Sequence, residues 1–153
     1  MADDDQDLAD RTAALAQAFI NAIPHSRELG MRLVEIGRGT AEMMVPYDDR
    51  FIGDPTTGVM HGGVMTALLD SCSGAAVMSH PEAPAGTATI DLRIDYMRPA
   101  EPGAEVHARA ECYRVTRNVA FVRAIAFTHD ADDPVATSAG AFTVERGRSG
   151  GEA

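Results

Sequence analysis

The chain has 153 residues, 45% of them hydrophobic, and a formal net charge of −10 from 23 acidic residues against 13 arginines and no lysine. This length fits one domain, and so acidic a chain without a basic run has little attraction for nucleic acid. No apolar run approaches the roughly 18–20 residues of a membrane span. The acidic N-terminus lacks the pattern of a signal peptide, so we expect a cytoplasmic protein that does not bind membranes.

The predicted elements begin with a short amphipathic helix over residues 6–23, in which apolar residues recur at helical spacing before Pro24 ends it. Residues 31–47 contain two extended runs on either side of Arg38-Gly39, a pattern that predicts a hairpin. Residues 48–60 contain glycine and proline and predict a loop.

A second predicted helix covers residues 62–79, which are mostly apolar or small and contain no proline. Four segments of alternating polarity then predict strands, at residues 87–97, 104–115, 118–129 and 134–146. Because no helix separates these strands, we expect an antiparallel sheet that curls around the apolar helix. The predicted organisation is an N-terminal helix and lead-in at 1–29, an α+β domain at 30–146 and a disordered tail at 147–153.

Asp70 is the first candidate functional residue, because it lies within the most apolar predicted helix. A carboxylate in such a place is usually paired, protonated or functional. The positions three and four residues away carry small side chains, and no arginine lies within one turn. Two interpretations remain open: a structural aspartate that caps or pairs with a distant group, and a catalytic carboxylate.

The second candidate is His61-Gly62-Gly63, at the predicted start of the same helix. The first N–H groups of a helix have no helical partner and lie at the positive end of its dipole. Glycine also lets a ligand approach the backbone closely. These groups suit a carbonyl oxygen that becomes an oxyanion, although a tight turn with a partly buried histidine is the structural alternative.

The spacing of the two candidates limits how they act together. Gly62 and Asp70 are eight residues apart, which is about 12 Å along a helix. One reacting carbon therefore does not contact both within one chain. If both serve one reaction, we expect a symmetric dimer in which the helix start of one copy faces Asp70 of the other.

The motif H-G-G-x-x-x-x-L-x-D-x-x-x-G-x-A, from His61 to Ala76, resembles that of the PaaI-type acyl-CoA thioesterases of the hotdog superfamily. The segment TATIDLRIDYMRPA at 87–100 is similar to the family's strand after the helix, and the resemblance covers about residues 30–146. It implies a hotdog fold, with an antiparallel sheet around one long central helix at 62–79, and here an extra N-terminal helix. It also implies hydrolysis of an acyl-CoA without a cofactor, an oligomer that is at least a dimer and by family habit a tetramer, and a link to phenylacetic acid degradation.

The resemblance implies roles for single residues. Asp70 matches the family's nucleophile or general base, and the Gly62 N–H matches the group that polarises the thioester carbonyl. His61 matches the histidine that orients this loop, and Thr89 lies where relatives carry a serine or threonine near the attacking water. Relatives often have an asparagine before the histidine, whereas this loop has none, and Asp54 stands in its place.

Binding of CoA requires positive charge for its phosphates, and arginine binds phosphate with a bidentate fork. Arg98, Arg114 and Arg117 are the candidates, with surface ion pairs as the alternative. The acyl pocket is expected to be apolar. The other substrate-binding candidates flank the helix start or follow the next strand: Gly63, Met60 and Met97.

The histidines and the two cysteines lack the spacing of metal ligands, so we expect no catalytic metal. Two alternative functions remain open. A hotdog hydratase or dehydratase would use His61 and Asp70 to move a proton on an acyl thioester. A non-catalytic module would bind acyl-CoA without hydrolysing it.

Overall fold

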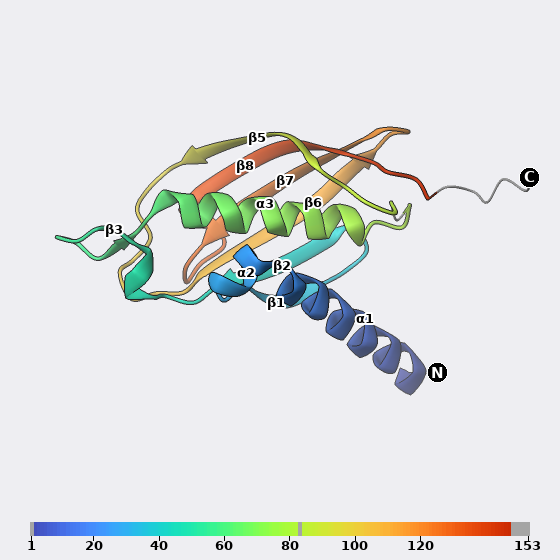
Figure 1. Cartoon of the computed structure of the whole chain (residues 1–153), viewed down its shortest axis with the longest axis horizontal. Coiled ribbons are helices and arrows are strands. Elements are labelled where there is room, and N and C mark those ends of the chain that lie inside the picture. The colour runs from blue at the N-terminus through green and yellow to red at the C-terminus, as the bar shows by residue number, and fades with distance from the viewer. Residues whose placement is uncertain (1, 83, 148–153) are drawn as a thin grey trace, which may run out of the picture.

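The computed structural model describes residues 2–82 and 84–147. A six-stranded sheet with the order β1-β2-β6-β7-β8-β5 holds one long helix, α3, against one face (Figure 1). All neighbouring strands are antiparallel, so the predicted single α+β domain with a central helix is confirmed. The strands of this sheet are β1 (Arg32–Ile36), β2 (Thr40–Val45), β5 (Thr89–Tyr96), β6 (Val106–Val115), β7 (Val119–Phe127) and β8 (Ala136–Thr143).

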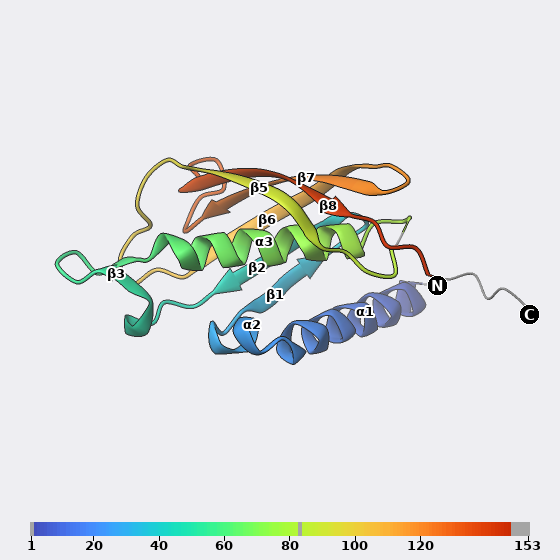
Figure 2. The same ribbon diagram turned by 45° about the horizontal axis from the view of Figure 1, so that its top comes forward.

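The N-terminal helix is confirmed, with different limits. The helix α1 (Ala2–Ala22) begins before the predicted residue 6. Pro24 was predicted only to end a helix, but it also begins the short helix α2 (Pro24–Glu28), because proline is tolerated in the first turn. Figure 2 shows α1 beside β1 at one edge of the sheet. Ile20 is buried there, and the Leu33 N–H donates to the Gln17 side chain over 2.6 Å.

Residues 48–60 are more ordered than the predicted loop. They form a 3-10 turn, η1 (Asp49–Phe51), and a hairpin of β3 (Ile52–Asp54) and β4 (Val59–Met60). The Asp54 carboxylate closes this hairpin by accepting hydrogen bonds from the backbone N–H and hydroxyl of Thr56 and the hydroxyl of Thr57. These bonds are local to the turn, and apolar periodicity does not reveal them. The hairpin leads directly into the central helix.

The central helix α3 (Gly62–Met78) has nearly the predicted limits. Its buried side chains, which include Leu68, Leu69 and Ala76, face the sheet. The facing sheet positions are mostly alanine or other small residues, which allows the helix to lie close to the strands. These buried alanines are Ala41, Ala108, Ala110, Ala120, Ala124, Ala126 and Ala136.

Both cysteines are buried in this interface and are free thiols. The Cys72 Sγ donates to the backbone oxygens of Ala41 and Ala108 over 3.4 and 3.2 Å. Burial raises the pKa of Cys72 to about 12. Burial also raises the pKa of Cys112 above its ordinary value. Neither thiol is therefore a ready nucleophile.

The edge strand β5 has a free side. It pairs with β8, and no other strand in the described part of the chain pairs with it. The register shifts between Thr89 and Asp91, which is a β-bulge. Large apolar side chains are exposed here: Ile90 is 55% exposed, Tyr96 53% and Met97 61%. A long unpaired edge with exposed apolar residues favours pairing with another strand.

Two further predictions concern the C-terminal tail and membrane-spanning segments. The predicted tail at 147–153 lies outside them except for Gly147. Within the described residues, no helix has the length and apolar character needed to cross a membrane.

Candidate active site

The start of α3 is held by the hairpin and by its own histidine. The His61 backbone N–H donates to the Phe51 carbonyl over 2.7 Å. His61 is the N-cap residue, and its Nδ1 accepts the Gly63 N–H over 2.8 Å. A neutral His61 ring that accepts at Nδ1 carries its proton on Nε2, so it remains a donor toward a ligand. The histidine thus caps the start of α3, and its catalytic role stays a prediction.

The Gly62 N–H is the free donor of this turn. It belongs to the first helical residue, which has no helical acceptor. No other acceptor for this N–H occurs in residues 2–82 and 84–147. The group combines an unpaired N–H with the positive end of the helix dipole, and therefore suits a carbonyl oxygen that gains negative charge.

Asp70 has a partner that periodicity did not reveal. The Thr89 hydroxyl donates to Asp70 Oδ1 over 2.7 Å. The bulge in β5 allows this bond, because it places Thr89 opposite the buried Phe142 and hence on the face that α3 covers. The second oxygen, Oδ2, has no hydrogen bond among the described residues. One oxygen is therefore held and the other is available.

Tyr96 is a site residue that the sequence reasoning missed. Its hydroxyl donates to the Gly62 carbonyl over 3.0 Å and hydrogen-bonds the Thr66 hydroxyl. The Thr66 hydroxyl oxygen lies 3.2 Å from the same carbonyl, and its single proton goes to the Tyr96 oxygen when Tyr96 donates to Gly62. The sequence offered only an aromatic residue before Met-Arg-Pro, and the contact joins positions 34 residues apart.

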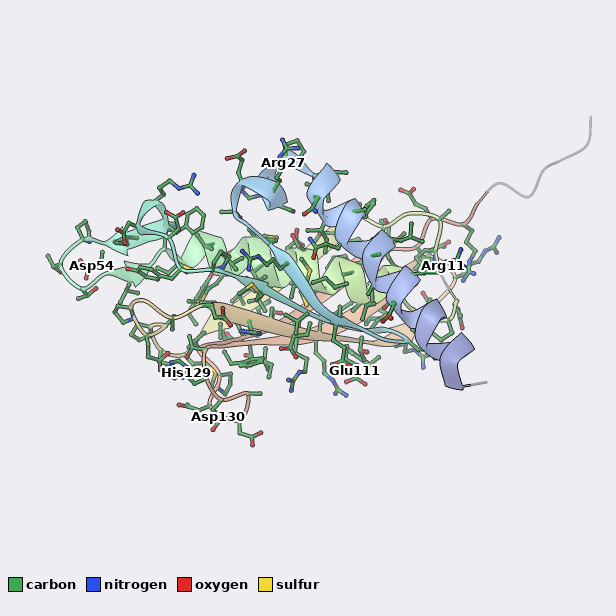
Figure 3. The ribbon with its side chains drawn as sticks, turned by 90° about the horizontal axis from the view of Figure 1, so that it is seen from below. Arg11, Arg27, Asp54, Glu111, His129 and Asp130 are labelled. Carbon is green, nitrogen blue, oxygen red and sulfur yellow. The ribbon has the colours of Figure 1, made fainter. Side chains whose placement is uncertain are left out.

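The other sequence candidates near the helix start lie in different surroundings. Met60 is buried and Met97 is exposed. Asp54 lies at the tip of the β3-β4 hairpin, away from α3 (Figure 3), and its carboxylate holds its own turn. Hydrogen bonds from Thr56, followed by one from Thr57, lower the pKa of Asp54 below its ordinary value. The carboxylate of Asp54 is therefore engaged in its own turn, and its role in substrate binding stays a prediction.

The three candidate arginines also differ. The Arg98 guanidinium bonds Glu101 over 2.8 Å and Asp133 over 3.2 Å, so carboxylates already surround it. The Thr128 hydroxyl, with the Glu101 backbone N–H and Arg98, lowers the pKa of Glu101 to about 2.

Arg114 and Arg117 lie at the β6-β7 hairpin and are exposed. In the part of the chain that the structure describes, neither guanidinium has an ion pair. They are therefore more available to an anionic ligand than Arg98.

A hollow of about 470 Å³ opens beside the helix start. Its lining is mixed and consists of His25, Leu29, Arg50, Phe51, Ile52, His61, Gly63 and Val64. A larger hollow of about 590 Å³ lies over charged residues on the sheet face opposite α3, where Arg109 and Arg123 pair with glutamates. Of these two hollows, the first adjoins the candidate site residues His61 and Gly63.

A sheet wrapped around one central helix, with a glycine donor at the helix start and a carboxylate two turns later, defines a hotdog-fold enzyme. The family model described as Thioesterase superfamily matches residues 57–134. A relative from Halobacterium salinarum is 34% identical over 146 residues, which are 90% of this chain and 95% of that protein. The chain belongs to the thioesterase superfamily and is a thioester hydrolase of the PaaI type, as the motif implied.

Two further proteins support this assignment. The medium/long-chain acyl-CoA thioesterase YigI of Escherichia coli K12 is 27% identical over 122 residues, which are 71% of this chain and 78% of YigI. The structure of a variant of the phenylacetic acid degradation protein PaaI from Thermus thermophilus has a TM-score of 0.69 and 27% identity. It covers 79% of this chain and 98% of that one.

Proposed function

We propose that this protein hydrolyses acyl-CoA thioesters to the free acid and CoA, in sites shared between two copies of the chain. The free edge of β5 carries this proposal. Two copies related by a two-fold axis would pair their β5 strands antiparallel. With this axis between Leu92 and Arg93, Thr89 of one copy lies opposite Tyr96 of the other. Within each chain, Thr89 bonds Asp70 and Tyr96 bonds Gly62. This pairing therefore brings the Gly62 donor of one copy toward Asp70 of the other.

The chemistry follows from these groups. The thioester oxygen accepts the Gly62 N–H, and the helix dipole stabilises the charge that develops on it. Asp70, through its available Oδ2, attacks the carbonyl carbon or removes a proton from the water that attacks it. The C–S bond breaks, a C–O bond to the acyl group forms, and the CoA sulfur takes up a proton. If Asp70 attacks directly, the first product is an acyl–Asp70 anhydride, which water then cleaves to the free acid and the restored carboxylate. Water is the only co-substrate, so the proposed reaction needs neither a metal nor a cofactor.

We assign the acyl group to the hollow beside His61, because apolar residues such as Leu29 and Phe51 line it. The similarity to a medium/long-chain acyl-CoA thioesterase supports an apolar acyl group. Arg114 and Arg117 are the first candidates for the CoA phosphates, since carboxylates already pair with Arg98. A tetramer, a cytoplasmic location and a role in phenylacetic acid degradation remain predictions.

The first test measures thiol release from short, long and aromatic acyl-CoAs by the wild type and Asp70→Asn. We expect hydrolysis by the wild type and a loss of kcat of more than about 10³-fold in the variant, because the nucleophile or base is gone. Asp132→Asn changes an exposed aspartate on the β7-β8 turn that contacts neither Asp70 nor Gly62, and is the matched control. Near-wild-type turnover by Asp70→Asn would show that Asp70 is structural.

The second test addresses the shared site with Gly62→Pro. Proline lacks the N–H, is tolerated as the first helical residue, and suits the extended backbone of His61 before it (φ −62°, ψ 134°). We expect kcat to fall by about 10²–10³-fold with the fold kept.

Mixing the Gly62→Pro and Asp70→Asn chains by co-refolding tests whether the two groups come from different copies. A mixed dimer contains one site with both wild-type groups, so we expect about a quarter of wild-type activity to return. No recovery would place both groups of each site in one chain and contradict the proposed dimer.

A further inference from the structure

The peptide group that joins Gly62 and Gly63 is held at both ends. Its carbonyl accepts the Tyr96 hydroxyl over 3.0 Å, and the Thr66 hydroxyl, whose oxygen lies 3.2 Å from the same carbonyl, donates to the Tyr96 oxygen. Its N–H donates to His61 Nδ1 over 2.8 Å. Two side chains thus restrict one peptide plane at the start of α3.

This restraint matters because consecutive glycines are the least restricted backbone available. The Gly62 N–H lies on the preceding peptide, and its direction depends on rotation about the Gly62 backbone bonds. Fixing the next peptide limits that rotation, and the Val64 N–H, which donates to the His61 carbonyl over 3.0 Å, restrains the preceding peptide from its other side. An oxyanion donor is effective only when it is oriented before the charge develops.

The Tyr96 hydroxyl is not needed to complete the helix. In α3 the Gly62 carbonyl is already the helical acceptor for the Thr66 N–H. The Tyr96 ring lies beside Gly62, where an added Cβ would meet the ring at 3.4 Å.

We propose that Tyr96 is a positioning residue that orients the Gly62 N–H for catalysis. This inference rests on the proposed function. In each copy, β5 then contributes two positioning contacts. Thr89 holds the Asp70 carboxylate, and Tyr96 orients the oxyanion donor. Pairing of two β5 strands then sets the distance between donor and carboxylate.

The test compares Tyr96→Phe with Tyr113→Phe. Tyr113 is 51% exposed on β6, and its ring lies against the Arg123 guanidinium, so it is a matched tyrosine away from the site. We expect Tyr96→Phe to lower kcat by about tenfold with KM within about twofold, because the donor is misoriented rather than removed. Tyr113→Phe retains wild-type kinetics.

Amide hydrogen exchange of Gly63 gives a readout that does not depend on turnover. We expect at least about tenfold faster exchange in Tyr96→Phe, because the peptide plane becomes free to rotate. An unchanged kcat, a change in KM alone, or unchanged Gly63 exchange would each overturn the inference. Absence of thiol release by the wild type would instead overturn the proposed function, and the exchange data would still test the restraint.

Discussion

Gly53→Ala tests how closely the β3-β4 hairpin positions the active site. A Cβ built on Gly53 lies 2.8 Å from the His61 Cα and 3.2 Å from its backbone nitrogen. Gly53 is not among the glycines with positive φ, so alanine meets no backbone strain there. The effect of the substitution is therefore steric and falls on the backbone of the N-cap residue.

The magnitude follows from the contact. His61 and β3 must separate by about 0.6 Å to restore ordinary van der Waals distance. A misplacement of about 1 Å can reduce a rate by about 10²-fold, so we expect kcat to fall by about tenfold. Overpacking of this kind also costs about 1–3 kcal/mol of unfolding free energy.

The assay is thiol release from the best acyl-CoA, together with thermal unfolding. Thr56→Ala is the control, because it removes a 2.7 Å hydrogen bond at the hairpin tip without pushing on His61. Thr56→Ala is expected to keep its kcat within about twofold even if the hairpin is less stable. Full kcat in Gly53→Ala would refute the view that β3 positions the helix start.

Three further predictions test the surroundings of the site. Thr89→Val removes the hydrogen bond to Asp70 while keeping a β-branched side chain, and we expect kcat to fall by about tenfold, less than in Asp70→Asn; an unchanged kcat would contradict a holding role. Cys72 and Cys112 are buried with raised pKa values, so the folded protein should not react with Ellman's reagent at pH 8 until it is unfolded; one rapidly reacting thiol would show that this packing is wrong. Glu101 has a pKa lowered to about 2, so its stabilising contribution is present above about pH 4.5 and is lost as the pH falls toward 2. Denaturant unfolding of Glu101→Gln should therefore show a stability deficit at pH 7 that shrinks below pH 4.5, and a deficit independent of pH would exclude this ionisation as its cause.

Local pattern was sufficient for most of the secondary structure. The alternation of polarity located the four later strands, and the apolar run located α3 to within one residue of its end. The hairpin at β3-β4 was missed, because its stability comes from Asp54 side-chain bonds rather than from periodicity. The second role of Pro24 was missed because a proline that stops one helix is also tolerated in the first turn of another.

In the candidate site, too, sequence revealed the local features and missed the long-range contacts. The motif from His61 to Asp70 is local in sequence, and helical spacing alone shows that its two ends do not meet within one chain. Sequence could not supply the partners of these groups. Thr89 and Tyr96 reach Asp70 and Gly62 across 19 and 34 residues, and both contacts depend on the register of β5.

By itself, then, the sequence determined the elements, the family motif and the need for a second chain if Gly62 and Asp70 act together. Only the tertiary structure determined that β5 lies at a free edge, that its bulge turns Thr89 toward α3, and that Tyr96 restrains the glycine pair. The physical reason is that propensity and periodicity act over a few residues. Strand order and register are instead set by packing between distant segments, where a slip of one residue would turn each of these side chains to the opposite face.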